Sequence, residues 1–214
     1  MYLPEHFALD DTQQIQQLIG DYPLASLIYQ DQGELQAEHL PGVFLPEPSD
    51  GKARLFFHAA AGNRLAQLAS SANARVLAIF QGPSGYVTPG WYEEKASSGE
   101  VVPTYNFAVV QVHGRLTRID DEQVFLERLS LLSDHFENQR PQPWRVSDAP
   151  PEFIRGLLQA IVGLELEIEQ VTAKFKLSQN KSLINQHNIA EGLSQTGSQA
   201  LSALMTQRLF RDGA

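Results

Sequence analysis

Hydrophobic and polar residues follow two periodicities along this chain of 214 residues. Alternation with a period of two, or a short unbroken apolar run, predicts a β-strand, whereas apolar residues three or four positions apart predict a helix. The chain is predicted to form strands over residues 24–29, 34–40, 53–58, 75–81, 105–119 and 163–177. It is predicted to form helices over residues 10–19, 122–136 and 150–161, from about residue 63, and as a pair at the C-terminal end. Residues 46–51 and 82–103 are expected to be loops.

Two strands carry more detailed predictions. Residues 31–33 read as a hairpin turn, and the strand after it places Leu35, Ala37 and His39 on one apolar face. In the last strand, apolar residues occupy even-numbered positions up to Ile168 and odd-numbered positions beyond Gln170. A pattern of period two cannot change phase without an extra residue, so we predict a β-bulge or sharp bend near Gln170.

The order of these elements favours one fold class. Six or seven strands, mostly joined by short turns and with helices between them, predict a mainly β protein, an antiparallel barrel with peripheral helices. A doubly wound parallel sheet is disfavoured because strands and helices alternate irregularly. We expect a barrel domain over residues 1–179 and a helical extension over residues 180–214.

Composition narrows the function classes. The chain has no cysteine, which excludes disulfides, thiolate metal sites and cysteine nucleophiles. No apolar run approaches the ~20 residues of a membrane helix, and the first residues lack the features of a signal peptide, so a cytoplasmic protein is expected. The formal net charge of −9 weighs against a wide nucleic-acid footprint. Residues 174–214 are nonetheless net basic, which indicates either a solvated strand end or a local anion site.

Two segments could bind an anion. Residues 56–64 run from a strand through small residues into a helix start, where backbone N–H groups and Arg64 could hold a phosphate; the alternative is an ordinary capped helix. Residues 174–181 place lysines and hydrogen-bonding side chains at a strand exit, where they could bind a phosphate or the polar edge of a ring; the alternative is a charged strand edge that resists aggregation.

A third segment could hold a ring. Residues 82–92 and 102–106 combine aromatics with prolines, which could wall a flat ligand or simply pack over a barrel end. The histidines show no metal-binding spacing, and histidines such as His39 and His113 read equally well as structural residues. No nucleophile elbow, P-loop or dinucleotide-binding glycine motif is present.

These blocks together resemble one known family. The resemblance rests on residues 1–7, 39–41, 57–63, 82–92, 102–106, 161–163 and 174–181, in that order along the chain. They resemble the PaiB-type family, the FMN-binding negative transcriptional regulators, which is similar to the flavin-binding split barrels that include pyridoxamine phosphate oxidase. The resemblance implies an antiparallel FMN-binding split β-barrel that forms a homodimer, with FMN at the subunit interface.

The resemblance also implies a set of cofactor-binding residues. The strand-to-helix segment that contacts phosphate in those barrels matches His58, Asn63 and Arg64 here; the Ser-Arg-Lys of the broader oxidases becomes Gly62-Asn63-Arg64, with one basic contact fewer. The lysine block could offset that loss, from the other subunit. The full FMN-binding prediction comprises His39, His58, Asn63, Arg64, Tyr86, Trp91, Lys174, Lys176, Ser178 and Gln179. No metal ligand and no catalytic residue is assigned.

Three functions remain open at this point. The family implies a flavin-binding regulator. The helical pair at the C-terminal end offers only Arg208 and Arg211 for direct DNA contact, so that contact is weakly supported, and regulation through another protein or a small molecule stays open. The alternative is an FMN-dependent oxidoreductase or flavin reductase, in which His39, His58 and Tyr86 would surround the ring. A haem-binding barrel with an axial histidine is the third reading.

Overall fold

The computed structural model describes residues 1–45, 51–70 and 74–212. Its contacts divide the chain into two compact units. The larger unit comprises Thr12–Phe80 and Val110–Val171, and the smaller unit comprises Met1–Asp11, Gln81–Val109 and Thr172–Ala214. The division at residue 179 expected from the sequence remains a prediction.

Three long strands contribute residues to both units. They are β6 (Ala74–Val87), β7 (Thr104–Ile119) and β8 (Ile161–Lys176). The other elements of the larger unit are α1 (Thr12–Asp21), β2 (Leu24–Asp31), β3 (Glu34–Pro41), β4 (Val43–Phe44), β5 (Arg54–Ala60), α2 (Arg64–Ala69), α4 (Glu122–Glu137), the short 3-10 helix η3 (Val146–Asp148) and α5 (Pro151–Leu158). Those of the smaller unit are η1 (Glu5–Phe7), β1 (Ala8–Leu9), η2 (Pro89–Trp91), α3 (Glu94–Ser97), α6 (Leu183–Gln195) and α7 (Gln199–Asp212).

The sheet of the larger unit has the order β3-β2-β6-β7-β8-β5-β4. Strand β2 pairs antiparallel with β3 and β6, and β5 pairs antiparallel with β4 and β8. The β2–β3 hairpin turns at Gln32 and Gly33, whose φ angles of 50° and 88° are the positive values that a type I′ turn requires at both central positions. The predicted hairpin is therefore confirmed.

Helix α4 covers part of the sheet in the larger unit and closes a hydrophobic cluster. It packs Phe125 and Leu132 against Val43, Leu45 and Phe56 of the β4–β5 region. Asp121 caps the helix by accepting a hydrogen bond from the backbone N–H of Val124, so the amphipathic helix predicted here begins at a defined residue.

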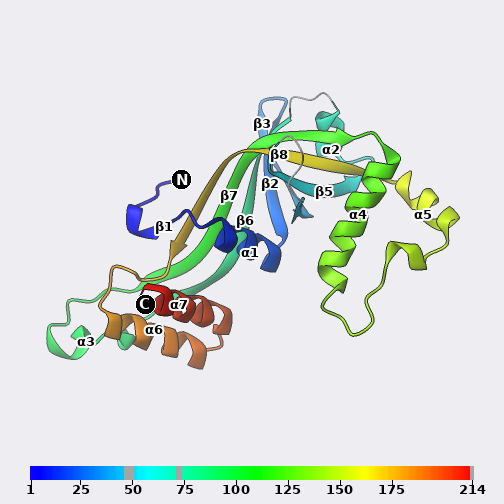
Figure 1. Ribbon diagram of the computed structural model, residues 1–214. Helices are drawn as coiled ribbons and strands as arrows, with labels where there is room; N and C mark the ends of the chain where they lie inside the picture. The colour runs from blue at the N-terminus through cyan, green and yellow to red at the C-terminus, as the bar shows by residue number, and fades with distance from the viewer. Residues whose placement is uncertain (46–50, 71–73, 213–214) are drawn as a thin grey trace. The chain divides into compact units, whose positions relative to one another are not determined.

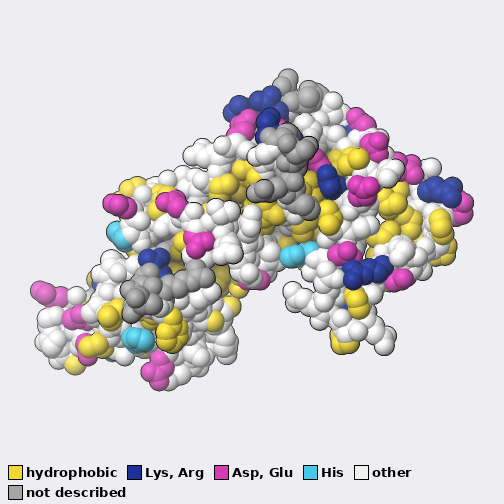
Figure 2. All heavy atoms as spheres, in the orientation of Figure 1, with side chains coloured by type: hydrophobic (Ala, Val, Ile, Leu, Met, Phe, Trp, Pro, Cys, Tyr) yellow, Lys and Arg dark blue, Asp and Glu magenta, His cyan; other side chains and the backbone are white. Residues whose placement is uncertain are grey.

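Some apolar residues of the larger unit are not covered. The face of β3 that carries Leu35, Ala37 and His39 is exposed, with Leu35 78% accessible, and β3 is an edge strand of the sheet. Helix α5 buries none of its residues, and hydrophobic side chains are visible at the surface in its vicinity (Figure 2). The apolar alternation of β3 thus predicts the strand correctly but not a buried face.

In the smaller unit, helices α6 and α7 lie side by side and cover one face of the strands (Figure 1). Gly85 of β6 lies against Leu193 and Leu201 of these helices, and Asn106 of β7 contacts Met205 of α7. Residues 82–87, which the sequence predicted as a loop, belong to strand β6. Glycine there reflects the close approach of the helices rather than a break in the strand.

Strand β8 changes its buried face as the phase of its sequence predicts. Val162, Leu164 and Leu166 are buried in the larger unit, whereas Ala173 and Phe175 are buried in the smaller one. Residues 169–171 between them are exposed, and the strand is continuous through this region. The phase change is confirmed, and the bulge near Gln170 remains a prediction.

Two further observations complete the fold. Most of the loop predicted at residues 46–51 lies outside the described residues. Over the described ranges, no helix combines the length and the apolar character needed to cross a lipid bilayer.

Candidate functional site

The start of α2 in the larger unit holds two of the predicted residues. Asn63 is the N-cap of α2, and its Oδ1 accepts a hydrogen bond of 2.8 Å from the backbone N–H of Leu65. Arg64 donates from Nε and Nη2 to the two carboxylate oxygens of Asp31, at 2.7 and 2.8 Å, and from Nη1 to Gln67 at 3.3 Å. This bidentate pair fixes the plane of the guanidinium and lowers the pKa of Asp31, chiefly through the hydrogen bond from Arg64.

Arg64 keeps part of its hydrogen-bonding capacity. A guanidinium has five N–H donors, and three are used by Asp31 and Gln67, so two have no partner among the described residues. The Arg64 side chain is 47% exposed. The site therefore presents an oriented, accessible cationic fork that suits an oxyanion such as a phosphate.

The two predicted histidines of the larger unit differ in their surroundings. His58 lies on β5 opposite Gly163 of β8, and its Nδ1 is buried with no hydrogen-bond partner among the described residues. Burial lowers the pKa of His58 below its ordinary value of 6.5, so the neutral ring is favoured. His39 is exposed on β3 opposite Ser26. Across the described residues, no hydrogen bond joins either histidine to Arg64.

Lys174 and Lys176 lie two positions apart on β8 in the smaller unit. Lys174 donates to the backbone oxygen of Tyr2 at 3.0 Å, and its Nζ lies 5.7 Å from the centre of the Phe107 ring. Lys176 donates to Thr104 Oγ1 and, at 2.6 Å, to the backbone oxygen of Tyr105. Burial, and then repulsion from Lys174, lower the pKa of Lys176. Neither lysine pairs with a carboxylate in the described parts of the chain.

Ser178 and Gln179 are occupied by contacts within the protein. Ser178 is buried with a φ of 64°, and it exchanges two hydrogen bonds with the side chain of Asn106, at 2.9 and 3.1 Å. Gln179 accepts from the backbone N–H of Leu177 at 2.7 Å and donates to the backbone oxygen of Phe175. These contacts hold the end of β8 in place.

The last two predicted residues are Tyr86, near the end of β6, and Trp91, in the aromatic segment after β6. Tyr86 is 54% exposed, whereas Trp91 is half-buried against Gly192 of α6. Asn185 of α6 holds the segment by accepting from the backbone N–H of Glu93 at 3.0 Å and donating to both carboxylate oxygens of Glu94. Trp91 is thus a packing contact in this unit, and Tyr86 faces solvent.

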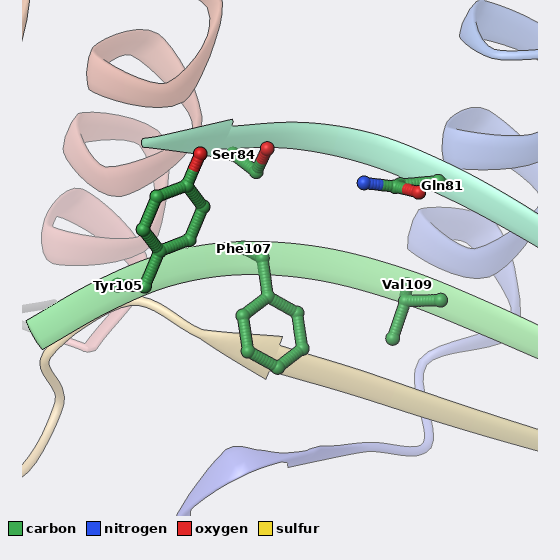
Figure 3. A pocket seen from close by; sticks show the side chains of 5 residues that line it. All are labelled: Gln81, Ser84, Tyr105, Phe107 and Val109. Atoms are coloured by element: carbon green, nitrogen blue, oxygen red, sulfur yellow. The ribbon is translucent and has the colours of Figure 1, made fainter. Parts of the chain in front are cut away.

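A pocket of the smaller unit was anticipated only in part, since Ser84 and Tyr105 belong to the aromatic segments expected to wall a flat ligand, whereas Gln81, Phe107 and Val109 do not. A cavity of about 330 Å³ lies between β6 and β7, lined by Gln81, Ser84, Tyr105, Phe107 and Val109 (Figure 3). The signal for it was the run of odd-numbered positions from Tyr105 to Val109, whose side chains occupy the face of β7 opposite the buried Asn106 and Ala108.

The antiparallel sheet with flanking helices is a split β-barrel. An FAD and heme binding protein from Mycobacterium smegmatis has this fold with a TM-score of 0.63, at 16% identity over 86% of this chain and 80% of its own. The flavocytochrome Anf3 from Azotobacter vinelandii gives a TM-score of 0.57, at 16% identity over 81% of this chain and 72% of its own. These likenesses confirm the predicted fold class.

The chain belongs to the family described as "Putative FMN-binding domain", which matches residues 1–170. The Bacillus subtilis protein named "Protease synthase and sporulation protein PAI 2" is 28% identical over 90% of this chain and 89% of its own length. An uncharacterized protein of Aspergillus fumigatus is 32% identical over 93% of both chains. The family resemblance is thereby confirmed, and FMN is the cofactor.

The residues present are compatible with FMN. Arg64 offers two uncommitted N–H donors for the phosphate, and the buried Nδ1 of His58 offers a further hydrogen-bonding atom in the same unit. Lys174, Lys176, Ser178 and Gln179 lie beyond residue 170, outside the part of the chain that the family matches. The ten predicted FMN contacts remain predictions.

Proposed function

We propose that this protein is a flavin-dependent regulator. In this proposal it is a homodimer that binds FMN, and the flavin-bound state changes its interaction with a partner that controls gene expression. The resemblance to the negative transcriptional regulators supports a regulatory role, and the Bacillus subtilis relative carries the words "sporulation protein" in its name. The net charge of −9 favours a protein partner over direct DNA contact.

The orientation of Arg64 by Asp31 is the observation that supports FMN binding in this proposal. A side chain held in place by two short hydrogen bonds loses little further entropy when it binds a phosphate, so its remaining donors are preorganised for the ligand. We assign the phosphate of FMN to Arg64, with Asn63 and His58 as accompanying residues. The remaining predicted contacts are His39, Tyr86, Trp91, Lys174, Lys176, Ser178 and Gln179.

Titration of the apoprotein with FMN tests this assignment. Arg64→Ala should weaken binding by about 1–3 kcal/mol, the usual contribution of a hydrogen bond to a charged group, which is roughly 5- to 150-fold in Kd. Asp31→Asn should weaken binding less, because it leaves Arg64 charged but less firmly oriented. Arg75→Ala is the matched control, since Arg75 is an exposed arginine of the same unit that pairs with Glu169. Equal affinity in wild type and Arg64→Ala would remove Arg64 from the site.

The regulatory role needs a test in cells. Transcripts should be compared among strains carrying the wild-type gene, a deletion, and an Arg64→Ala allele shown to have lost FMN binding. A flavin-dependent regulator predicts that the allele reproduces the changes caused by the deletion. Wild-type transcript levels in the allele, or sustained flavin turnover with NAD(P)H and an acceptor, would instead favour a flavin-independent role or the oxidoreductase alternative.

A further inference from the structure

The cavity between β6 and β7 has an aromatic lining and an unusual set of polar groups. Phe107 and Val109 supply apolar surface, and Figure 3 shows the Tyr105 ring rising from β7 towards Ser84 on β6. The side chains of Gln81, Ser84 and Tyr105 form no hydrogen bond with any described residue. One hydroxyl from each strand and one amide are thus available to a ligand at a site with an aromatic wall.

Two lysines border this site across β7. Lys174 Nζ lies 5.7 Å from the centre of the Phe107 ring, and Lys176 is bound to the backbone oxygen of Tyr105. Lys176 donates to two acceptors, so one of its three N–H donors has no partner among the described residues. Lys174 also lowers the pKa of Lys176, and a bound anion would relieve this repulsion.

The size of the cavity restricts the ligand. Small-molecule pockets span roughly 300–1,000 Å³, and 330 Å³ is at the lower end of that range. Such a volume accommodates one or two fused rings. The aromatic wall selects a planar ring, and the lysines select a negative substituent.

We propose that the cavity lined by Gln81, Ser84, Tyr105, Phe107 and Val109 binds a small planar aromatic carboxylate, as a second ligand in addition to FMN. The ring stacks beside Phe107, and the carboxylate lies towards Lys176 and the Tyr105 hydroxyl. Through this site a flavin-dependent regulator would respond to an aromatic acid. The inference rests on the smaller unit alone and assigns Lys174 and Lys176 to the carboxylate instead of to FMN, so it stands or falls independently of the role of Arg64.

Calorimetric titration of the full-length protein with 2-naphthoate tests the proposal, with 2-naphthamide as the neutral probe of the same shape. Naphthoate should bind saturably and about tenfold more tightly than the amide, the scale of one charge-assisted hydrogen bond. Phe107→Leu and Lys176→Met should each weaken naphthoate at least about fivefold. Tyr105→Phe provides a mild variant at a half-exposed site, and it should weaken naphthoate without disturbing the fold.

Phe153→Leu is the control for loss of an exposed aromatic ring, because Phe153 lies on α5 of the larger unit and is 58% exposed. Its affinity for naphthoate should equal that of the wild type. The same titration with saturating FMN should give an unchanged Kd. Competition by FMN would overturn the proposal by assigning the cavity to the flavin. The proposal would also be overturned if naphthoate failed to bind, if it bound no more tightly than the amide, or if its affinity for every cavity variant equalled that for the wild type.

Discussion

Replacing Gly192 with alanine tests how closely the aromatic segment after β6 is packed against α6. A Cβ at this position would lie 2.2 Å from Cε2 of Trp91 and 2.5 Å from both Cδ2 and Nε1. Ordinary contact begins at 3.4 Å, so the indole edge would have to retreat by about 1.2 Å. It cannot do so freely, because Asn185 binds the backbone of Glu93 two residues further on.

The expected magnitude follows from two opposing terms. Overpacking of this kind costs about 1–3 kcal/mol, whereas Gly to Ala within a helix contributes about 0.5–1 kcal/mol of stability. The net effect should be a loss of about 1–2 kcal/mol, measured as a shift of the urea midpoint at constant m-value. In a Trp91→Leu background the same substitution should cost less or become stabilising, because the steric conflict is removed.

Gly156 of α5 provides a matched control within the same protein. A Cβ added there would meet nothing within 4 Å, so Gly156→Ala should raise stability by about 0.5–1 kcal/mol. The two substitutions are chemically identical and should have opposite signs. A Gly192→Ala protein that is as stable as the wild type, or more so, would refute the close packing of Trp91 on α6.

Three other outcomes are expected from urea unfolding. Asn106→Ala and Ser178→Ala should each cost about 1–3 kcal/mol, and the double variant should cost less than their sum because each single change leaves the partner unpaired; strict additivity would show that the pair is not coupled. Tyr92→Phe should be neutral or stabilising by up to about 1 kcal/mol, because the Tyr92 hydroxyl is buried with no partner in the described structure; a clear loss would reveal a partner. Burial lowers the pKa of His58 below 6.5. Below pH 6.5 the unfolded chain therefore binds more protons than the folded chain, so the free energy of unfolding decreases as the pH is lowered, until the folded-state pKa of His58 is passed. His58→Gln should flatten this dependence as the pH is lowered below about 6.5, and an unchanged slope would contradict it.

The strands were predictable wherever local pattern and tertiary contact agreed. The phase change of β8 was visible in the sequence because the strand presents even-numbered residues to the core of the larger unit and odd-numbered residues to that of the smaller. The continuation of β6 to Val87 was not, because Gly82, Pro83 and Gly85 carry the signals of a loop. Only the closeness of Leu193 and Leu201 to Gly85 explains the glycine there.

The candidate site was predictable only in part, because a residue's type reveals the chemistry of its side chain but not the hydrogen bonds that the side chain already forms within the protein. The sequence identified Arg64 as a cation at a helix start, but its pairing with Asp31 depends on a contact between residues 33 positions apart. Likewise, the sequence presents Ser178 and Gln179 as ligand contacts. The hydrogen bonds between Ser178 and Asn106 are tertiary contacts, and the hydrogen bond from Gln179 to the backbone of Phe175 depends on a local turn, so neither could be predicted from the sequence. Tyr105 falls within a segment expected to wall a flat ligand, but Phe107 does not, because the apolar pattern of β7 marks only its buried, even-numbered face.

The two units also differ in when they can be completed during synthesis. All segments of the larger unit have been made once Val171 has been added, whereas the smaller unit still lacks Thr172–Ala214, which contains both α6 and α7. At ~5–20 residues per second this interval lasts about 2–9 s. During it, the apolar faces of β6 and β7 in the smaller unit have no helices to cover them, so this segment is where a nascent chain would need protection by a chaperone.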